Sequence, residues 1–196
     1  MTLPIYSLVI DENINGEAEV NFMALVDKPA IEKNFQLFKE QTKLQLSIQN
    51  EDKRIIAGAA MLADTPIYRN DSNGEYYVVF SKETIKQIVE KFFKKGYVQN
   101  FNIMHDGGEV VKDVTIFQSF ISDSEIGISP MKGYEDAPEG SWFIAAKVDN
   151  EEVWNRVKSG ELRGFSVEGI FNIKKEKFSK EEAIKKIEDI LSCTNF

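Results

Sequence analysis

The chain has 196 residues, 42% of them hydrophobic, and a formal net charge of -8 at pH 7. This length predicts one domain with at most a small appendage, and the apolar fraction is enough for a core. The acidic balance argues against nucleic-acid binding, which needs clustered Lys and Arg. The opening residues MTLPIYSLVIDEN lack the basic leader and apolar core of a signal peptide, and no apolar run is long enough to span a bilayer. We therefore expect neither a nucleic-acid nor a membrane partner.

Cysteine and histidine each occur once, as Cys193 and His105. A single cysteine cannot form an intramolecular disulfide, which fits a reducing compartment. Structural zinc usually takes four Cys or His ligands, so a zinc site is not expected. The sequence predicts no metal and no other cofactor.

The N-terminal half is typical of short strands separated by turns. An Asn-Gly turn at Asn15 and Gly16 lies between the first two strands, and further turns are predicted at residues 64–68 and 71–74. Pro66 cannot occupy a central strand because it lacks a backbone donor. The strands expected here are residues 3–10, 18–26, 43–49, 53–62 and 75–80.

The C-terminal half mixes strands with three helices. Apolar residues at helical spacing predict a helix over residues 82–95 with Ser81 as its N-cap. Asn150 is expected to cap a second helix over residues 151–158. A capping box that begins at Ser179 predicts a C-terminal amphipathic helix within residues 176–196. The strands expected here are residues 97–104, 110–121, 141–148 and 161–171, and residues 122–140 form an acidic loop.

These nine expected strands, one of which (43–49) lies in an ambiguous stretch, and three helices predict an α+β, mainly β protein. Strands do not alternate regularly with helices, so a doubly wound parallel sheet is excluded. A compact, mostly antiparallel sheet or barrel with peripheral helices fits better. The predicted division is a β-barrel domain over residues 1–175 and the C-terminal helix over residues 176–196.

The stretch ELRGFSVEGIF, residues 161–171, has two unlike faces. Phe165 and Val167 share an apolar face, whereas Ser166 and Glu168 share the other. Period two is typical of a half-buried strand. Glycines at 164 and 169 weaken a strand unless a backbone or ligand must come close. One interpretation is an ordinary solvated face, and the other is a serine nucleophile with room for a substrate.

A serine nucleophile needs a base within hydrogen-bond reach, and His105 is the only histidine available. His105 ends a predicted strand at a Gly-Gly turn, although it shares parity with Phe101 and Ile103. A bulge or turn at Asp106 must therefore redirect its side chain. GFSVEG does not match G-x-S-x-G, which excludes the nucleophile elbow of α/β-hydrolases. The chymotrypsin layout, with its disulfide-supported secreted fold, is not expected either, because the chain has a single cysteine.

Six separated blocks can be compared with known families: IYSLVI, NFMALVDKPAIEKNF, IIAGAAMLADTPIYR, NFNIMHDGGEV, VTIFQSFISD and PEGSWFIAAKVDNEEVWNRVKSGELRGFSVEGIF. These blocks resemble the phage prohead (capsid maturation) serine proteases of the XkdF-like type, and more remotely the herpesvirus assemblins. They agree in order and spacing over roughly residues 3–173. The resemblance implies a compact β-barrel with surrounding helices.

Carried over by position, His105 matches the family's histidine and Ser166 its serine nucleophile. The third member of the triad is open among three acids. Glu168 is the first choice, because residues two apart lie on one strand face, about 6.6 Å apart, and an imidazole can fit between them. Asp123 is second and Asp106 third.

The resemblance implies a serine endopeptidase that cleaves scaffold and capsid precursors during phage head maturation. It would act in the bacterial host cytoplasm, inside the assembling procapsid. Phage scaffold and major capsid proteins are the expected substrates, and a homo-oligomer is left open. The alternative is a non-catalytic capsid- or scaffold-associated protein that retains the fold. A third class, a β-barrel ligand-binding module, does not account for the small residues beside Ser166.

Overall fold

A computed structural model describes residues 3–27, 47–50, 53–72 and 74–174. The predicted C-terminal helix and the first part of the predicted strand 43–49 lie outside the described residues. Two α-helices and two 3-10 turns are present in this part: α1 (Lys82–Lys94), α2 (Glu151–Lys158), η1 (Tyr97–Gln99) and η2 (Ser124–Ile126). The strands are β1 (Ile5–Val9), β2 (Glu19–Val26), β3 (Ser47–Asn50), β4 (Ile55–Met61), β5 (Ile67–Asp71), β6 (Gly74–Val79), β7 (Phe101–Ile103), β8 (Asp106–Val111), β9 (Val114–Ile121), β10 (Trp142–Val148), β11 (Gly164–Ile170) and β12 (Asn172–Lys174).

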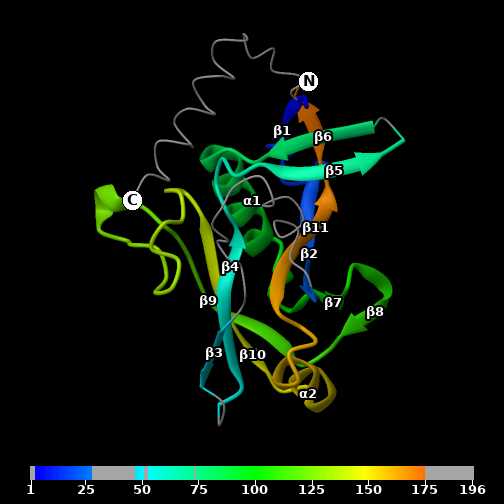
Figure 1. Cartoon of the computed structure of the whole chain (residues 1–196), viewed down its shortest axis with the longest axis vertical. Coiled ribbons are helices and arrows are strands. Elements are labelled where there is room, and N and C mark those ends of the chain that lie inside the picture. Colours follow the sequence, from blue (N-terminus) through cyan, green and yellow to red (C-terminus); the bar gives the residue numbers. More distant parts are fainter. Residues whose placement is uncertain (1–2, 28–46, 51–52, 73, 175–196) are drawn as a thin grey trace.

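The strands form three four-stranded sheets (Figure 1), in the orders β12-β1-β6-β5, β3-β4-β10-β9 and β11-β2-β7-β8. Pairing is antiparallel except between β1 and β6 and between β2 and β7. β11 leads directly into β12, so one chain segment joins two of the sheets. The predicted α+β, mainly β and mostly antiparallel fold is confirmed. Across the described residues, however, the three ladders do not close into a barrel.

The first two predicted strands are present but do not pair with each other. β1 pairs with β12 and β6, whereas β2 pairs with β11 and β7. Asp11 closes the connection between them, because its backbone N–H donates to the Ala18 carbonyl at 2.9 Å and its carboxylate accepts from the Ala18 N–H at 2.8 Å. A Cβ on Gly16 would lie 2.4 Å from the Asp11 Cβ, so glycine is required here by close approach.

Two predicted strands differ from those of the structure. The strand predicted over 97–104 is shorter, and the strand predicted over 110–121 is divided in two. In place of a strand over 97–104, Gly96 leaves α1 with a φ of 73° and is followed by η1 and then β7. In place of a strand over 110–121, β8 and β9 are separated by Asp113, whose φ is 61°. Aspartate tolerates this left-handed conformation better than most residues. The polar pairs Gln99–Asn100 and Lys112–Asp113 lie at these two breaks and interrupt the apolar alternation.

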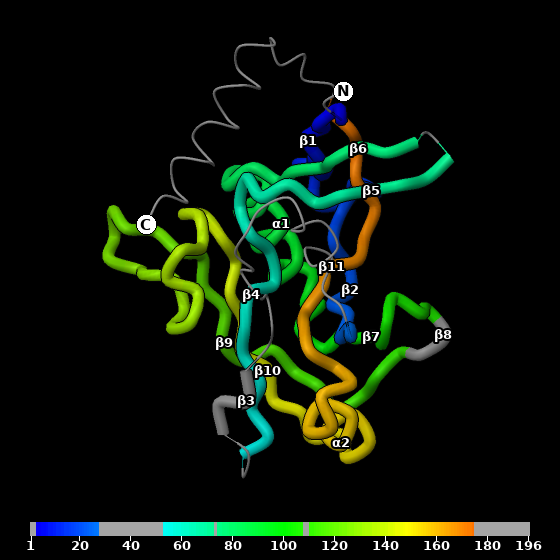
Figure 2. Tube along the Cα trace, in the orientation of Figure 1, coloured from blue at the N-terminus to red at the C-terminus, as the bar shows by residue number. Residues whose placement is uncertain are grey.

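Helix α1 was predicted correctly, including its cap. Ser81 accepts a hydrogen bond from the Thr84 N–H at 3.2 Å. Ile85, Ile88 and Phe92 are fully buried, whereas Phe93 is exposed. The Phe92 ring meets Trp142 of β10 edge to face, with ring centroids 5.6 Å apart. Figure 2 shows α1 near the middle of the molecule, beside β2. Helix α2 also matches its predicted bounds, with Asn150 accepting from the Val153 N–H at 3.0 Å.

Lys91 of α1 is buried and anchors the connection between β1 and β2. Its side chain is only 5% exposed. Its ammonium group donates to three backbone carbonyls at 3.0–3.2 Å, those of Asp11, Gly16 and Ala18. Three donors therefore meet three acceptors, which compensates for the burial of the charge.

Glu19, the first residue of β2, supplies the opposite charge. Its carboxylate lies 3.6 Å from the Lys91 ammonium, pairs with Lys95, and accepts from the Tyr97 hydroxyl at 2.9 Å. Burial alone would raise the pKa of Glu19. The hydrogen bonds from Lys95 and Tyr97 and the charges of the two lysines outweigh it, so the pKa lies below its ordinary value of 4.5. This cluster ties α1 to the sheet that carries Ser166.

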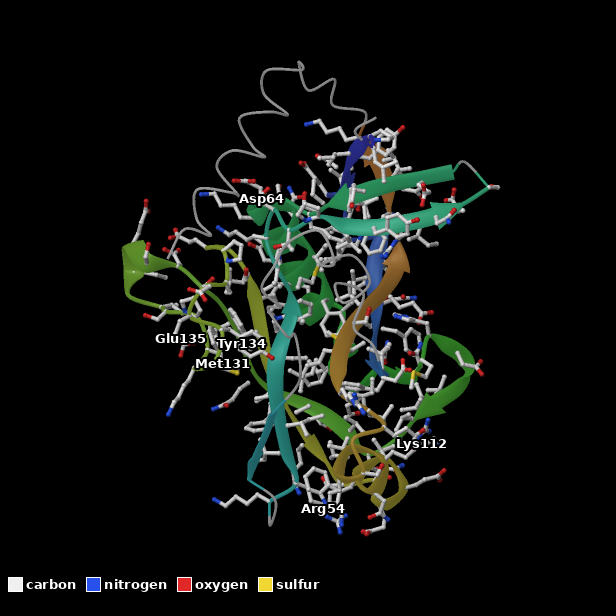
Figure 3. All side chains as sticks on the ribbon, in the orientation of Figure 1. Arg54, Asp64, Lys112, Met131, Tyr134 and Glu135 are labelled. Carbon is white, nitrogen blue, oxygen red and sulfur yellow. The ribbon has the colours of Figure 1, made fainter. Side chains whose placement is uncertain are left out.

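The loop of residues 122–140 is packed against the sheet that contains β4. Tyr134 is buried against Phe143 of β10, with ring centroids 5.6 Å apart. Burial raises the pKa of Tyr134, and a hydrogen bond with the Ala59 backbone partly opposes the shift. Figure 3 shows Tyr134 and Met131 between this loop and β4, and Arg54 near α2, where its guanidinium pairs with Glu151 at 2.5 Å.

Candidate active site

Three neighbouring strands place one row of side chains on the same face of a sheet. In the ladder β11-β2-β7, Ser166 lies opposite Ala24, and Ala24 lies opposite Asn102. Residues paired across a sheet project from the same face. Their sequence neighbours Phe165, Leu25 and Ile103 lie within the core. Burial of those side chains therefore fixes which face of the sheet carries the serine.

A tight turn brings His105 back over this face. β7 ends at Ile103 and β8 begins at Asp106, and the two residues between them both have positive φ, 53° at Met104 and 60° at His105. Positive φ at both central residues is the condition for a type I′ hairpin turn. The bulge or turn expected at Asp106 is present as a turn that ends at Asp106, where β8 begins. The turn consists of Met104 and His105 themselves.

Ser166, His105 and Glu168 form a continuous hydrogen-bonded chain. The His105 Nε2 lies 3.0 Å from the Ser166 Oγ, and the His105 Nδ1 lies 3.3 Å from the Glu168 Oε2. The second distance is slightly longer than the usual N–H···O range. Ser166 is 8% exposed, whereas the side chains of His105 and Glu168 are 42% and 35% exposed. The hydroxyl is thus shielded while the imidazole faces solvent.

The two contacts of the ring fit one imidazole tautomer. An ionised carboxylate can only accept, so a hydrogen bond between Nδ1 and Glu168 requires that the proton of the neutral ring is on Nδ1. The Nε2 then has a free lone pair directed at Ser166. In this tautomer the hydroxyl donates to the imidazole. This is the arrangement needed to draw a proton from a serine that attacks a carbonyl.

Two further residues of this face were missed by the sequence analysis. Asn102 is 1% exposed, and its Nδ2 donates to the Glu168 Oε2 at 2.6 Å. Ala24 is fully buried and lies between Ser166 and Asn102 in the sheet. A small residue here leaves the imidazole space above the sheet. A polar residue between Phe101 and Ile103 was a visible signal for Asn102, but its partner could not be read from the sequence.

The two other candidate acids take different places. Asp123 is the N-cap of η2, where its Oδ1 accepts from the Glu125 N–H at 3.1 Å. Figure 1 shows the 122–140 loop on the opposite side of the molecule from the β7–β8 hairpin. Asp106 is exposed at the first position of β8, opposite Ile103. The structure therefore brings Glu168, and not Asp123, to the imidazole.

Gly169 has a structural role that differs from the substrate space considered in the sequence analysis. A Cβ at this position would lie 2.0 Å from the Glu19 carbonyl oxygen and 2.8 Å from the Val20 Cα. The register between β11 and β2 shifts at this point, where Glu168 pairs with Phe22 and Gly169 with Val20. The glycine thus permits close approach of the β2 backbone at a bulge.

Nothing in the described part of the chain gathers three or more His, Cys, Asp or Glu side chains into a potential metal site. Among its helices, none combines the length and apolar character needed to cross a membrane. A hollow on the outer surface of α2 is lined by residues of that helix and of the segment after it, such as Glu152, Arg156 and Ser159. It includes neither Ser166 nor His105.

The comparison with protein families gives a match over residues 42–175, more than half of the chain, to the family described as "Putative phage serine protease XkdF". The chain belongs to this family. The matched region contains both His105 and Ser166. The predicted resemblance to XkdF-like proteins is therefore confirmed.

Two curated relatives come from Bacillus subtilis (strain 168). The phage-like element PBSX protein XkdF is 22% identical over 81% of this chain and 55% of its own length. The "Uncharacterized protein YqbD" is 24% identical over 78% of this chain and 44% of its own length. The chain thus spans about half the length of the curated relatives it matches. No solved structure gives a significant match.

Proposed function

We propose that this protein is a serine endopeptidase in which Ser166 is the nucleophile, His105 the general base and Glu168 the orienting acid. The observation that carries the proposal is the 3.0 Å contact between the His105 Nε2 and the Ser166 Oγ, with the Nδ1 of the same ring facing Glu168. A serine hydroxyl becomes an effective nucleophile only with such a base in reach. Membership of a phage serine protease family supports the same chemistry.

The reaction follows acyl transfer. The Ser166 Oγ attacks the substrate carbonyl while its proton passes to the His105 Nε2. The imidazolium is stabilised by Glu168 and then donates that proton to the leaving amine, which breaks the peptide bond. Water, deprotonated by the same imidazole, hydrolyses the acyl-serine and returns the hydroxyl. The carboxylate of Glu168 keeps the Nδ1 protonated throughout.

The proposed substrates are the scaffold and major capsid precursors of the phage, cleaved in the host cytoplasm inside the assembling procapsid. The family's phage origin supports this assignment. The same proposal includes an evolutionary relationship between this protein and the prohead proteases and assemblin-like barrels. It is supported by the mostly antiparallel strands, and by a histidine that precedes its serine in the chain and meets it across a sheet.

The test is a mass spectrum of the capsid and scaffold proteins in precursor heads assembled with wild-type protein or with Ser166→Ala. We expect defined cleavage products with the wild type and full-length precursors with the variant. Loss of one hydroxyl from a residue flanked by Phe165 and Val167 creates little cavity, so the fold should be kept.

Ser159→Ala is the matched control, because the Ser159 hydroxyl at the end of α2 donates to the Arg156 carbonyl and not to a base. Heads assembled with Ser159→Ala should show the same cleavage products as heads assembled with the wild type. Wild-type cleavage by Ser166→Ala would remove Ser166 from the mechanism. Heads that contain the wild-type protein but only uncut precursors would favour the non-catalytic capsid- or scaffold-associated alternative.

A further inference from the structure

Asn102 is a polar residue in an almost wholly apolar setting. It is 1% exposed and lies in β7 between Phe101 and Ile103, which are 0% and 1% exposed. A buried amide costs free energy unless its donors and acceptor find partners. An apolar side chain of similar size would avoid this cost. The amide of Asn102 is therefore expected to have a role that offsets this cost.

The donor side of the amide has a strong partner. The Asn102 Nδ2 donates to the Glu168 Oε2 at 2.6 Å, a hydrogen bond assisted by the charge of the carboxylate. The same oxygen is the one that faces the His105 Nδ1 at 3.3 Å. Asn102 thus holds the particular carboxylate atom that meets the imidazole.

The acceptor side of the amide is left without a partner. The Asn102 Oδ1 is buried and is the one such unpartnered side-chain atom among the described residues. Because a carboxylate can only accept, turning the amide over would place two acceptors against each other. The unsatisfied oxygen is therefore a consequence of presenting the Nδ2 to Glu168. The main effect of the amide is therefore on the position of the Glu168 carboxylate, since its unpartnered oxygen costs the fold stability.

Glu168 needs such an anchor because its side chain is one-third exposed and the imidazole it faces is more exposed still. A solvated carboxylate has several rotamers and would spend part of its time away from the ring. Asn102 is held rigidly by its neighbours in the core, and its place in the sheet is set by the register with Ala24. It can thus restrict the carboxylate to one orientation.

We propose that Asn102 is a positioning residue that fixes the Glu168 carboxylate against the His105 Nδ1 and so selects the imidazole tautomer that accepts from Ser166. The expected effect of Asn102 on cleavage rests on the proposed function. The hydrogen-bonded arrangement itself can be tested without any cleavage, because His105 is the only histidine in the chain. Its ring signals in a nuclear magnetic resonance spectrum need no further assignment.

The test compares wild type, Asn102→Leu and Asn100→Leu by the ¹⁵N chemical shifts of the two ring nitrogens, at a pH at which the imidazole is neutral. Leucine keeps the branched shape and the number of heavy atoms of the Asn102 side chain but removes the donor. Asn100 is a matched control two residues earlier, since its Nδ2 donates to the Asn21 carbonyl and not to Glu168. We expect the proton on Nδ1 in the wild type and in Asn100→Leu, and a shift towards the Nε2–H tautomer in Asn102→Leu.

Cleavage kinetics give the second readout. Asn102→Leu should lower kcat about ten- to a hundredfold, as loss of an outer partner of a catalytic group often does, with little change in KM. If Asn102→Leu does not fold, Asn102→Ser replaces it, because a serine hydroxyl is too short to reach Glu168.

The inference and the proposed function fail in different ways. The positioning role would be overturned if the wild-type ring is protonated on Nε2. It would also be overturned if the Asn102 variant keeps both the tautomer and the kcat of the wild type. Both conclusions hold even if the protein cleaves its substrates. A tautomer that changes only in the Asn102 variant supports the positioning role even if no cleavage is seen. In that case the proposed function would be the part that fails.

Discussion

At the scale of single residues, the site depends on side chains whose directions are set by their strands. The alternation in β11 correctly placed Ser166 and Glu168 on one face, since period two needs only local sequence. The direction of His105 was not predictable, because it requires a positive φ at Met104, a residue type that rarely adopts it. Such local strain is often found at functional sites.

The identity of the orienting acid can be tested by two isosteric substitutions. We expect Glu168→Gln to keep the fold and lower turnover by about two to four decades, because the imidazolium loses its charge partner. Asp123→Asn should leave turnover near normal, since asparagine also caps helical turns and can still accept from the Glu125 N–H. Parallel kinetics on both variants provide the measurement.

The reverse pattern, with normal turnover in Glu168→Gln and collapse in Asp123→Asn, would move the role to Asp123. Normal turnover in both would indicate that Ser166 and His105 act as a pair without a carboxylate.

At the scale of elements, capping signals were reliable and strand pairing was not. Ser81 and Asn150 start their helices as predicted, because a cap is a contact between residues three apart. β1 and β2, in contrast, lie in different sheets although an Asn-Gly turn stands between them. Pairing is decided by partners more than 70 residues away in sequence, such as β7 for β2. The proximity of Asn102 to Glu168 depends on that long-range register.

The bulge between β11 and β2 makes a prediction about stability. Gly169→Ala should lower the free energy of unfolding by about 1–3 kcal/mol, because the new Cβ would overlap the Glu19 carbonyl. Gly107→Ala in β8 is the control, since nothing lies within 4 Å of a Cβ there. Thermal or denaturant unfolding of both variants provides the comparison.

Equal stability of Gly169→Ala and the wild type would show that the β2 backbone does not approach as closely as described. In that event the glycine would be better explained by space for a substrate beside Ser166.

At the scale of the whole molecule, the mainly β fold and the family were predictable from the sequence, but the arrangement of three sheets was not. Composition and the spacing of turn signals indicate the fold class. The way in which β11 passes into β12, and so joins two sheets, depends on packing among distant segments. The charge cluster of Lys91 and Glu19 that holds α1 to the β2 sheet is likewise a tertiary feature. Both features support the sheet on which the site is built.

The central claim is that His105 activates Ser166. It is tested most directly by mass spectrometry of the protein after reaction with a fluorophosphonate, which forms a covalent adduct with an activated serine and releases fluoride. We expect one adduct on the peptide that contains Ser166, no adduct in Ser166→Ala, and labelling at least about a hundredfold slower in His105→Ala. A Ser166 adduct that forms equally fast without His105, or a wild-type protein that remains unlabelled at Ser166, would contradict the account.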